Sequence, residues 1–271
     1  MAGKCTLGMI GVGNMGAALV RGIVSAGAVP AAEVMVSDAD AKRAAALARE
    51  LGVAAAGNTD VARACDFVVL AVKPGIVESV VKEIAPALRS EQVLVSIAAG
   101  VTIARIRDHL GDAKPELVRV MPNTPALVGA GILAMAAPGL AEKKRAALAG
   151  MLSAAGAVVE VGEELMDAVT GLSGSGPAFV FVMIEALADG GVAAGLPRPL
   201  AQQLAAQTVA GAAKLVQETG QHPGALKDAV ASPRGTTIAG LAELERGGFR
   251  GLVASAVRAS AARAREMSRG S

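Results

Sequence analysis

Apolar and polar positions follow two different patterns along the chain, and the change falls close to residue 162. Before it, short continuous apolar runs are separated by turns or by amphipathic stretches of helical length. Continuous apolar runs of this kind predict strands that are buried on both faces. The expected strands are 5–10, 34–37, 67–72, 92–97, 117–121, 131–135 and 157–161.

Helical patterns separate several of these runs, at 15–26, 39–51 and 142–155. Alternating strands and helices predict a parallel sheet covered on both faces, the doubly wound α/β class. After residue 162 no β-branched run recurs, and an all-α domain is expected over 163–271, following an α/β domain over 1–162. Its expected helices lie near 163–171, 176–194, 198–219, 223–230, 236–247 and 251–268.

Small aliphatic side chains must fill the core. Hydrophobic residues make up 53% of the chain, yet it has no Trp or Tyr and four Phe. Helices rich in Ala and Gly often leave apolar faces for a partner chain, so we expect a homo-oligomer. The net charge of +2 comes from 26 basic and 24 acidic residues without a basic block, which argues against a nucleic-acid partner.

Signals for membranes, disulfides and metals are weak. Glu185 and Asp189 interrupt the apolar run of the second domain, and the chain enters a strand pattern without a signal-peptide region. We therefore expect a cytoplasmic protein with no membrane partner. Cys5 and Cys65 lie in or beside apolar runs, which predicts buried free thiols. The two scattered histidines match no zinc spacing, so no metal is expected.

The stretch GMIGVGNMG places Gly11, Gly13 and Gly16 directly between the first strand and a helix. The first glycine allows the tight turn, the second allows a pyrophosphate to approach the backbone, and the third allows helix and strand to meet. Free amides at the helix start face the phosphates. A glycine turn without a ligand is the alternative. The pattern predicts a dinucleotide-binding (Rossmann) domain whose cofactor contacts are Gly11, Val12, Gly13, Asn14, Met15 and Gly16.

Ser37 and Asp38 stand at the end of the second strand and are expected cofactor contacts, because an acidic side chain there commonly accepts hydrogen bonds from the adenosine ribose. Asp38 would repel a 2′-phosphate, so NADH is modestly favoured over NADPH. Lys42 and Arg43 follow closely, and either could turn toward a phosphate. Asp38 could instead serve only as a charge ahead of the next helix.

Loops after later strands should flank the nicotinamide half of the cofactor, because ligands of such sheets bind beyond the carboxyl ends of the strands. Lys73 could be only a solvated loop cation, and the segment around Asn123 only a stiff turn between two prolines. The expected contacts in these loops are Ala71, Val72, Lys73, Pro74, Ala98, Ala99, Gly100 and Asn123.

Two polar interruptions occur in the helical domain. The stretch GLSGSGP, 171–177, should break a helix and restart it, leaving free amides near Ser173 and Ser175 that suit a substrate carboxylate. The stretch SPRGTTIAG, 232–240, provides a second helix start with adjacent hydroxyls. Capping explains one hydroxyl, but it does not readily explain two such breaks in an apolar domain.

These motifs resemble the pyrroline-5-carboxylate reductase family along essentially the whole chain, including IGVGNMG, AVKP, MPNTP, SGSGPAFVF and HPGALKDAVASPRGTTIAGLAELE. The resemblance implies a helical domain that interlocks with a second subunit, giving homodimers that can build larger rings such as a decamer. It implies NADPH- or NADH-dependent reduction of 1-pyrroline-5-carboxylate to L-proline, the last step of proline biosynthesis.

The resemblance also implies residue roles. Thr237 would lie beside the substrate ring nitrogen as the catalytic residue, and Asn58 near the adenosine ribose. Two departures matter: Phe179 replaces a common tyrosine, and Arg234 stands where the family usually has glycine. Arg234 could face solvent or pair with the substrate carboxylate. The substrate contacts implied are Ser175, Gly176, Val230, Ser232, Gly235, Thr236 and Thr237.

A cyclic imine suits a chain with little histidine. Its nitrogen is readily protonated, so positioning and charge stabilisation carry most of the catalysis. A β-hydroxyacid dehydrogenase, the nearest rival, would need a Lys after the Gly-rich segment, and the stretch PAFVFVM after Gly176 has none. A non-catalytic NAD(P) sensor is the alternative from another class.

Overall fold

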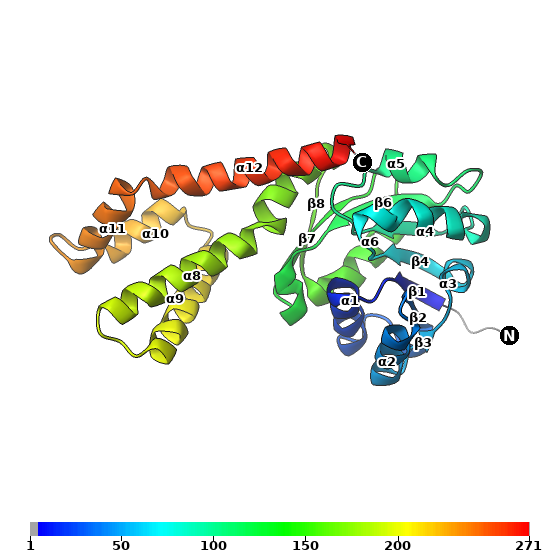
Figure 1. Cartoon of the computed structure of the whole chain (residues 1–271), viewed down its shortest axis with the longest axis horizontal. Coiled ribbons are helices and arrows are strands. Elements are labelled where there is room, and N and C mark those ends of the chain that lie inside the picture. Colours follow the sequence, from blue (N-terminus) through cyan, green and yellow to red (C-terminus); the bar gives the residue numbers. More distant parts are fainter. Residues whose placement is uncertain (1–4, 271) are drawn as a thin grey trace. The chain divides into compact units, whose positions relative to one another are not determined.

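The chain forms two compact units in its computed structural model, which describes residues 5–270 (Figure 1). The first unit comprises Met1–Ser175 and Ala259–Ser271, and the second comprises Gly176–Arg258. The chain therefore leaves the first unit once and returns to it at the end of the last helix.

An eight-stranded sheet in the order β3-β2-β1-β4-β5-β6-β7-β8 organises the first unit. Seven strands agree with the predicted runs. The two-residue β3 was not predicted, because two exposed alanines carry no strand pattern. The strands are β1 Cys5–Ile10, β2 Val34–Ser37, β3 Ala54–Ala55, β4 Cys65–Leu70, β5 Val93–Ser96, β6 Glu116–Met121, β7 Gly131–Ala136 and β8 Gly156–Glu160.

Not every strand is parallel, which corrects the expectation. The pairing of β6 with β7 is antiparallel, whereas β7 and β8 are parallel to each other. The connection from β6 to β7, residues 122–130, holds only the short 3-10 turn Thr124–Val128. Antiparallel strands can be joined by such a short connection, whereas parallel neighbours need a crossover.

Helices cover both faces of the sheet, which confirms the doubly wound class. One face packs against α1 Asn14–Ser25, α2 Ala41–Leu51 and α6 Glu142–Leu152. The other packs against α3 Asn58–Ala64, α4 Val77–Ile84 and α5 Ile103–Asp108.

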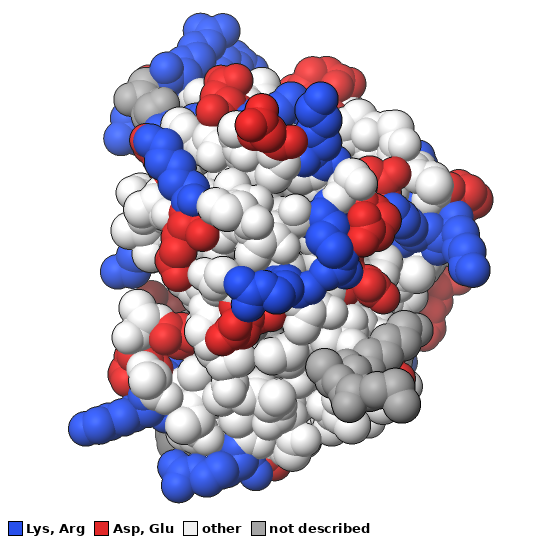
Figure 2. All heavy atoms as spheres, turned by 90° about the vertical axis from the view of Figure 1, so that its right-hand side faces the viewer, with Lys and Arg blue, Asp and Glu red and all other residues white. Residues whose placement is uncertain are grey.

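Figure 2 shows one side of the molecule, where basic and acidic side chains are interspersed over an otherwise uncharged surface.

Cys5 and Cys65 form a disulfide, so the expectation of free thiols was wrong. The two residues are register partners on the neighbouring strands β1 and β4, with their Cα atoms 4.5 Å apart. Side chains of directly paired residues point to the same face of a sheet. The pairing depends on strand register across 60 residues of sequence, which local patterns do not show.

The second unit is helical, as predicted, and its helices begin and end within a few residues of the expected positions. Its core is small, with Ala188 of α8 buried against Ala201 and Ala205 of α9. Many large apolar side chains of the same helices are exposed, among them Phe181 and Val182. The helices are α8 Gly176–Ala193, α9 Arg198–Thr219, α10 Pro223–Val230, α11 Thr236–Arg246 and α12 Phe249–Gly270.

The predicted helix break at 171–177 is absent from this described part of the chain. The helix α7 Met166–Val169 continues through a π-helical turn, Thr170–Gly174, into α8. The Ser175 amide donates to the Thr170 carbonyl at 2.9 Å, and the Ser173 hydroxyl donates to the carbonyl of Val169. The expectation of free amides at Ser175 was therefore wrong. The wider π-helical turn accommodates the glycines without ending the helix.

One helical run of the described residues is long and apolar enough to cross a membrane by length and composition alone. It spans Glu163–Ala193, has a mean hydropathy of 1.4 and is mostly exposed. Glu185 and Asp189 lie inside it.

Candidate active site

The glycine turn after β1 has the geometry that its sequence predicts. Gly11 has a φ of +95°, and a Cβ there would lie 2.6 Å from the Ala71 carbonyl oxygen. A Cβ on Gly16 would lie 2.1 Å from the carbonyl oxygen of Gly11. No heavy atom lies within 4 Å of a Cβ built on Gly13. The turn therefore needs glycine at two positions for the fold and leaves open space at the third.

The start of α1 faces this space without a side-chain cap. Gly13 is the N-cap residue, and Asn14 and Met15 open the first turn. Uncapped amides and the positive end of a helix dipole suit a phosphate group. The arrangement fits the pyrophosphate of a dinucleotide.

A cleft beyond the strand ends brings many of the predicted cofactor residues together. Gly11, Gly13, Asp38, Asn58 and the loop after β4 all line it. Ser37, Asp38 and Asn58 also line an adjoining hollow with α2. The residues lining the cleft are Ile10, Gly11, Gly13, Asp38, Ala39, Arg43, Asn58, Ala71, Val72, Lys73, Ile76 and Val80.

Asp38 holds the glycine turn as well as lining the cleft. Its carboxylate accepts hydrogen bonds from the amides of Val12, at 2.8 Å, and Asp40, at 2.9 Å. A terminal nitrogen of Arg43 lies 3.3 Å from the same carboxylate. The charge of Arg43 is therefore partly compensated by Asp38.

Asn58 is held in one orientation by two neighbours. The Ser37 hydroxyl donates to Asn58 Oδ1 at 2.6 Å, and Asn58 Nδ2 donates to Glu83 at 2.9 Å. Glu83, which lies on α4, was not predicted from the sequence. Its place on the face of α4 beside α3 carries no motif of its own.

Lys73 lines the cleft and is exposed. Its ammonium group makes no hydrogen bond or ion pair with residues 5–270, so it is available to a ligand. Pro74 follows it and begins a short 3-10 turn, Pro74–Ile76. The proline fixes the direction in which the chain leaves the cleft.

The remaining predicted nicotinamide contacts do not line this cleft. Ala98 and Gly100 are buried, and Ala99 is half-buried between them. Asn123 is buried too, and its Oδ1 accepts a hydrogen bond from the Ile132 amide at 2.9 Å. Asn123 thus holds the connection between β6 and β7, while its role toward the cofactor stays a prediction.

Most of the predicted substrate residues lie in the second unit, around the turn between α10 and α11. Val230 ends α10, and the Gly235 amide donates to the Ser232 carbonyl at 3.0 Å to close the turn. Arg234 has a φ of +58°, the one positive value of a non-glycine residue in the described chain. Proline at the second position and a positive φ at the third are typical of a type II turn.

A Cβ on Gly235 would lie 2.2 Å from the Ser232 hydroxyl oxygen and 3.1 Å from the Ser232 carbonyl oxygen, so the serine hydroxyl would have to rotate to admit a side chain. Gly235 is the N-cap residue of α11, and no side chain caps this helix. Thr236 and Thr237 form the first turn beside the uncapped amides. The segment therefore offers hydroxyls and amides at the positive end of a helix, which suits a carboxylate.

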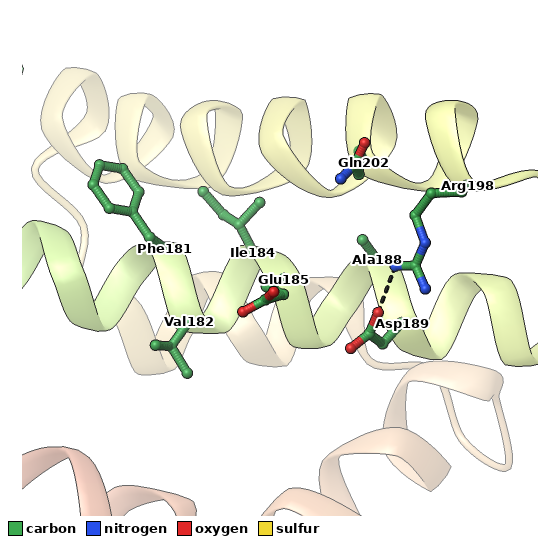
Figure 3. Close-up of a pocket in the computed structure, with 8 residues that line it drawn as sticks. All are labelled: Phe181, Val182, Ile184, Glu185, Ala188, Asp189, Arg198 and Gln202. Atoms are coloured by element: carbon green, nitrogen blue, oxygen red, sulfur yellow. Dashed lines mark hydrogen bonds and ion pairs between the residues drawn. The ribbon is translucent and has the colours of Figure 1, made fainter.

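Ser175 and Gly176 stand at the division between the units, Ser175 ending the first and Gly176 opening α8. Another hollow lies between α8 and α9 in the second unit. Figure 3 shows Ile184 and Ala188 pointing from α8 toward α9, with an ion pair between Asp189 and Arg198. Among residues 5–270, no group of three or more His, Cys, Asp or Glu side chains could hold a metal ion.

Two family models match the chain. Residues 6–100 match NADP oxidoreductase, coenzyme F420-dependent, and residues 163–267 match pyrroline-5-carboxylate reductase dimerisation. The second match begins where the predicted helical domain begins, although the compact units divide after Ser175. The boundary at residue 162 stays a prediction.

Relatives match the chain over nearly its full length. Pyrroline-5-carboxylate reductase of Pisum sativum is 46% identical and aligns over 97% of this chain and 96% of its own. A structure from Coxiella burnetii described as a pyrroline-5-carboxylate reductase is 34% identical with a TM-score of 0.91, covering 98% of this chain and 99% of its own. Plasmodium falciparum pyrroline carboxylate reductase with NADP bound is 34% identical with a TM-score of 0.87, covering 98% and 100%.

Proposed function

Because this chain belongs to the pyrroline-5-carboxylate reductase family, we infer that it reduces the C=N bond of 1-pyrroline-5-carboxylate and releases L-proline, the last step of proline biosynthesis. The observation that carries the proposal is the uncapped start of α11 behind the Ser232–Gly235 turn, in a chain whose other unit has a dinucleotide cleft. A small carboxylate and a nicotinamide cofactor are the two ligands that these sites suit.

The cleft of the first unit would hold the cofactor. The open space at Gly13 and the uncapped amides of α1 would receive the pyrophosphate, and Asp38 and Asn58 would contact the adenosine ribose. Val72 and Lys73 would border the nicotinamide half. When bound, the reduced cofactor supplies a hydride from C4 of its nicotinamide ring.

Thr237 would orient the substrate nitrogen. The amides of the first turn of α11, with Ser232 and Thr236, would hold the substrate carboxylate, and Ser175, Gly176 and Val230 would border the ring. A protonated imine accepts a hydride without a strong acid nearby, so an orienting hydroxyl suffices. Fixed donors beside the reacting bond then supply the catalysis.

The rival reaction can be separated by one assay. The protein is mixed with NADH and either 1-pyrroline-5-carboxylate or a β-keto acid, and the absorbance of NADH is followed. Oxidation of NADH with the imine alone supports the proposal. Turnover of the β-keto acid alone would favour a hydroxyacid dehydrogenase, and binding of NADH without turnover of either would favour a nucleotide sensor.

We propose that NADH is modestly preferred over NADPH. The Asp38 carboxylate would repel a 2′-phosphate, and it also compensates the nearest cation, Arg43. Removing a unit charge about 4 Å away near water is worth about 1 kcal/mol, or about fivefold. We expect Asp38→Asn to shift the ratio of kcat/KM for NADH to that for NADPH toward NADPH by about this factor.

Arg43→Gln is the matched control for cofactor choice. It should lower kcat/KM for NADPH and leave that for NADH nearly unchanged. A parent enzyme whose kcat/KM strongly favours NADPH would overturn the proposed preference.

We propose a homodimer as the basic assembly, with a decamer as the larger ring that the resemblance implies. The exposed apolar side chains of α8 and α9 lie in the region that matches the dimerisation model. The second subunit of the dimer would also cover the apolar run Glu163–Ala193. We therefore place the protein in the cytoplasm rather than in a membrane. Recovery in the supernatant after ultracentrifugation without detergent tests this placement.

A further inference from the structure

Arg119 is a charged residue in the middle of a buried strand. It lies on β6, and only 3% of its surface is exposed. Its register partners are Ser96, the last residue of β5, and Ala136 of β7. An arginine so deep in a sheet needs a partner, because an uncompensated buried charge is costly.

The partner comes from outside the sheet. A terminal nitrogen of Arg119 lies 3.7 Å from Glu163 Oε1, and its other terminal nitrogen has no hydrogen-bond partner among the described residues. Burial lowers the pKa of the Arg119 guanidinium, and the charges of Glu163 and Asp167 oppose this effect. An arginine keeps its proton under such conditions, so the ion pair persists.

Glu163 also makes a second interaction, with the start of α5. The same Oε1 atom accepts a hydrogen bond from the Ile103 amide at 2.7 Å. Ile103 is the first residue of α5 and directly follows the loop 97–102 that contains Ala98, Ala99 and Gly100. One carboxylate thus joins β6 to the end of the predicted nicotinamide loop.

The segment that begins at Glu163 packs on the same face of the sheet. Met166 is buried against Ala134 and Ala136 of β7. A Cβ on Gly174 would lie 2.7 Å from the terminal methyl of Met121, which follows Arg119 on the same face of β6. Arg119 therefore lies where the start of α5 and the segment 163–175 meet on the sheet.

We propose that Arg119 and Glu163 are positioning residues for hydride transfer, which fix the loop 97–102 and the segment 163–175 on one strand. This inference rests on the proposed function. The adenosine half of the cofactor would be held elsewhere, by the glycine turn and Asn58. Loss of the ion pair should therefore alter the hydride-transfer step and leave cofactor affinity nearly unchanged.

Glu163→Gln is the principal test, because the amide side chain keeps an oxygen for the Ile103 amide but loses the charge. Glu163→Ala removes both interactions. Misplacement by about 1 Å can cost about 100-fold in rate, so we expect kcat to fall severalfold in Glu163→Gln and by tenfold or more in Glu163→Ala. The kinetic isotope effect with 4-deuterated NADH should rise in both, as hydride transfer limits turnover more.

Glu116→Gln is the matched control. Glu116 is the first residue of β6, forms an ion pair with Lys144 at 2.8 Å and is about as exposed as Glu163. It should leave kcat and the isotope effect unchanged. The Kd for NADH, measured from the fluorescence of the cofactor itself, should change less than twofold in all variants.

Three outcomes would overturn the inference. They are an unchanged kcat in Glu163→Ala, a lower kcat without a larger isotope effect, and a Kd for NADH that rises by as large a factor as kcat falls. Arg119→Lys keeps a charge on β6 and should lower kcat in the same direction. If the parent protein does not reduce the imine at all, the proposed function fails instead, so the two failures are distinguishable.

Discussion

Thr237 carries the sharpest prediction at the scale of a single residue. It is half-buried in the first turn of α11, beside amides that no side chain caps. Loss of one orienting hydrogen bond should lower kcat by about one to two orders of magnitude, the value of one catalytic hydrogen bond. We expect this for Thr237→Ala in a steady-state assay with 1-pyrroline-5-carboxylate.

Thr237→Ser is the control for this prediction, because it keeps the hydroxyl and should retain most of the activity. Full activity in Thr237→Ala would remove the residue from the mechanism.

Arg234 gives a second prediction at this scale, because its φ of +58° is unfavourable for any residue with a Cβ. The left-handed conformation costs about 1–2 kcal/mol, while glycine loses about 0.5–1 kcal/mol more conformational entropy on folding. We therefore expect Arg234→Gly to raise the free energy of unfolding by about 0.5–1 kcal/mol, measured by urea denaturation.

The side chain of Arg234 is exposed and makes no hydrogen bond or ion pair with the described residues. We expect it to face solvent rather than the substrate, and the KM for the imine should then not change in Arg234→Gly. Arg234→Ala separates the two effects, since it removes the guanidinium but keeps the strained backbone. A higher KM in both variants would mean that the guanidinium binds the substrate carboxylate.

At the scale of elements, the disulfide between β1 and β4 makes a prediction about stability. It closes a loop of 60 residues, for which chain entropy suggests about 4 kcal/mol of stabilisation. We expect dithiothreitol to lower the urea midpoint of the oxidised parent markedly. Activity should persist, because both cysteines begin their strands and the cleft lies beyond the opposite ends.

Cys65→Ala should show the lower midpoint with or without reductant. An identical midpoint for the oxidised and reduced parent would contradict the cross-link.

The elements also show where sequence patterns are sufficient. The helices of the second unit were predicted closely because Gly and Pro mark most of their ends, as at Pro197, Gly220 and Pro223. The glycine turn and Asp38 were recognisable because their chemistry follows from positions close in sequence. Such features depend on local backbone preference.

Other features depend on residues far apart in sequence. The antiparallel β7, the disulfide and the pair of Arg119 with Glu163 follow from which strands and segments become neighbours. The π-helical turn was missed because glycines followed by a proline, as in GLSGSGP, are typical of a helix break. Residue roles in the substrate turn came from the family resemblance and stay predictions.

At the scale of the whole molecule, the exposed apolar side chains of the second unit predict association. Val182 of α8 is 66% exposed in the single chain. Burying a charge at a subunit interface is costly, so we expect Val182→Asp to convert the dimer largely to monomer in sedimentation equilibrium. Val128→Asp is the control, because Val128 is 81% exposed but lies in the first unit. A parent protein that sediments as a monomer would contradict the proposed assembly.

The end of α12 belongs to the first unit, which limits the fragments of this chain that can fold on their own. Ala264 is buried, the Ser268 hydroxyl donates to Asp167 at 2.9 Å, and a Cβ on Gly100 would lie 3.1 Å from Cβ of Met267. A fragment that stops at residue 162 or 175 would lack the end of α12. The apolar surface beside Gly100 would then be exposed to solvent. Expression of the first unit alone should therefore require the C-terminal segment Ala259–Ser271, supplied through a short artificial tether or as a separate peptide.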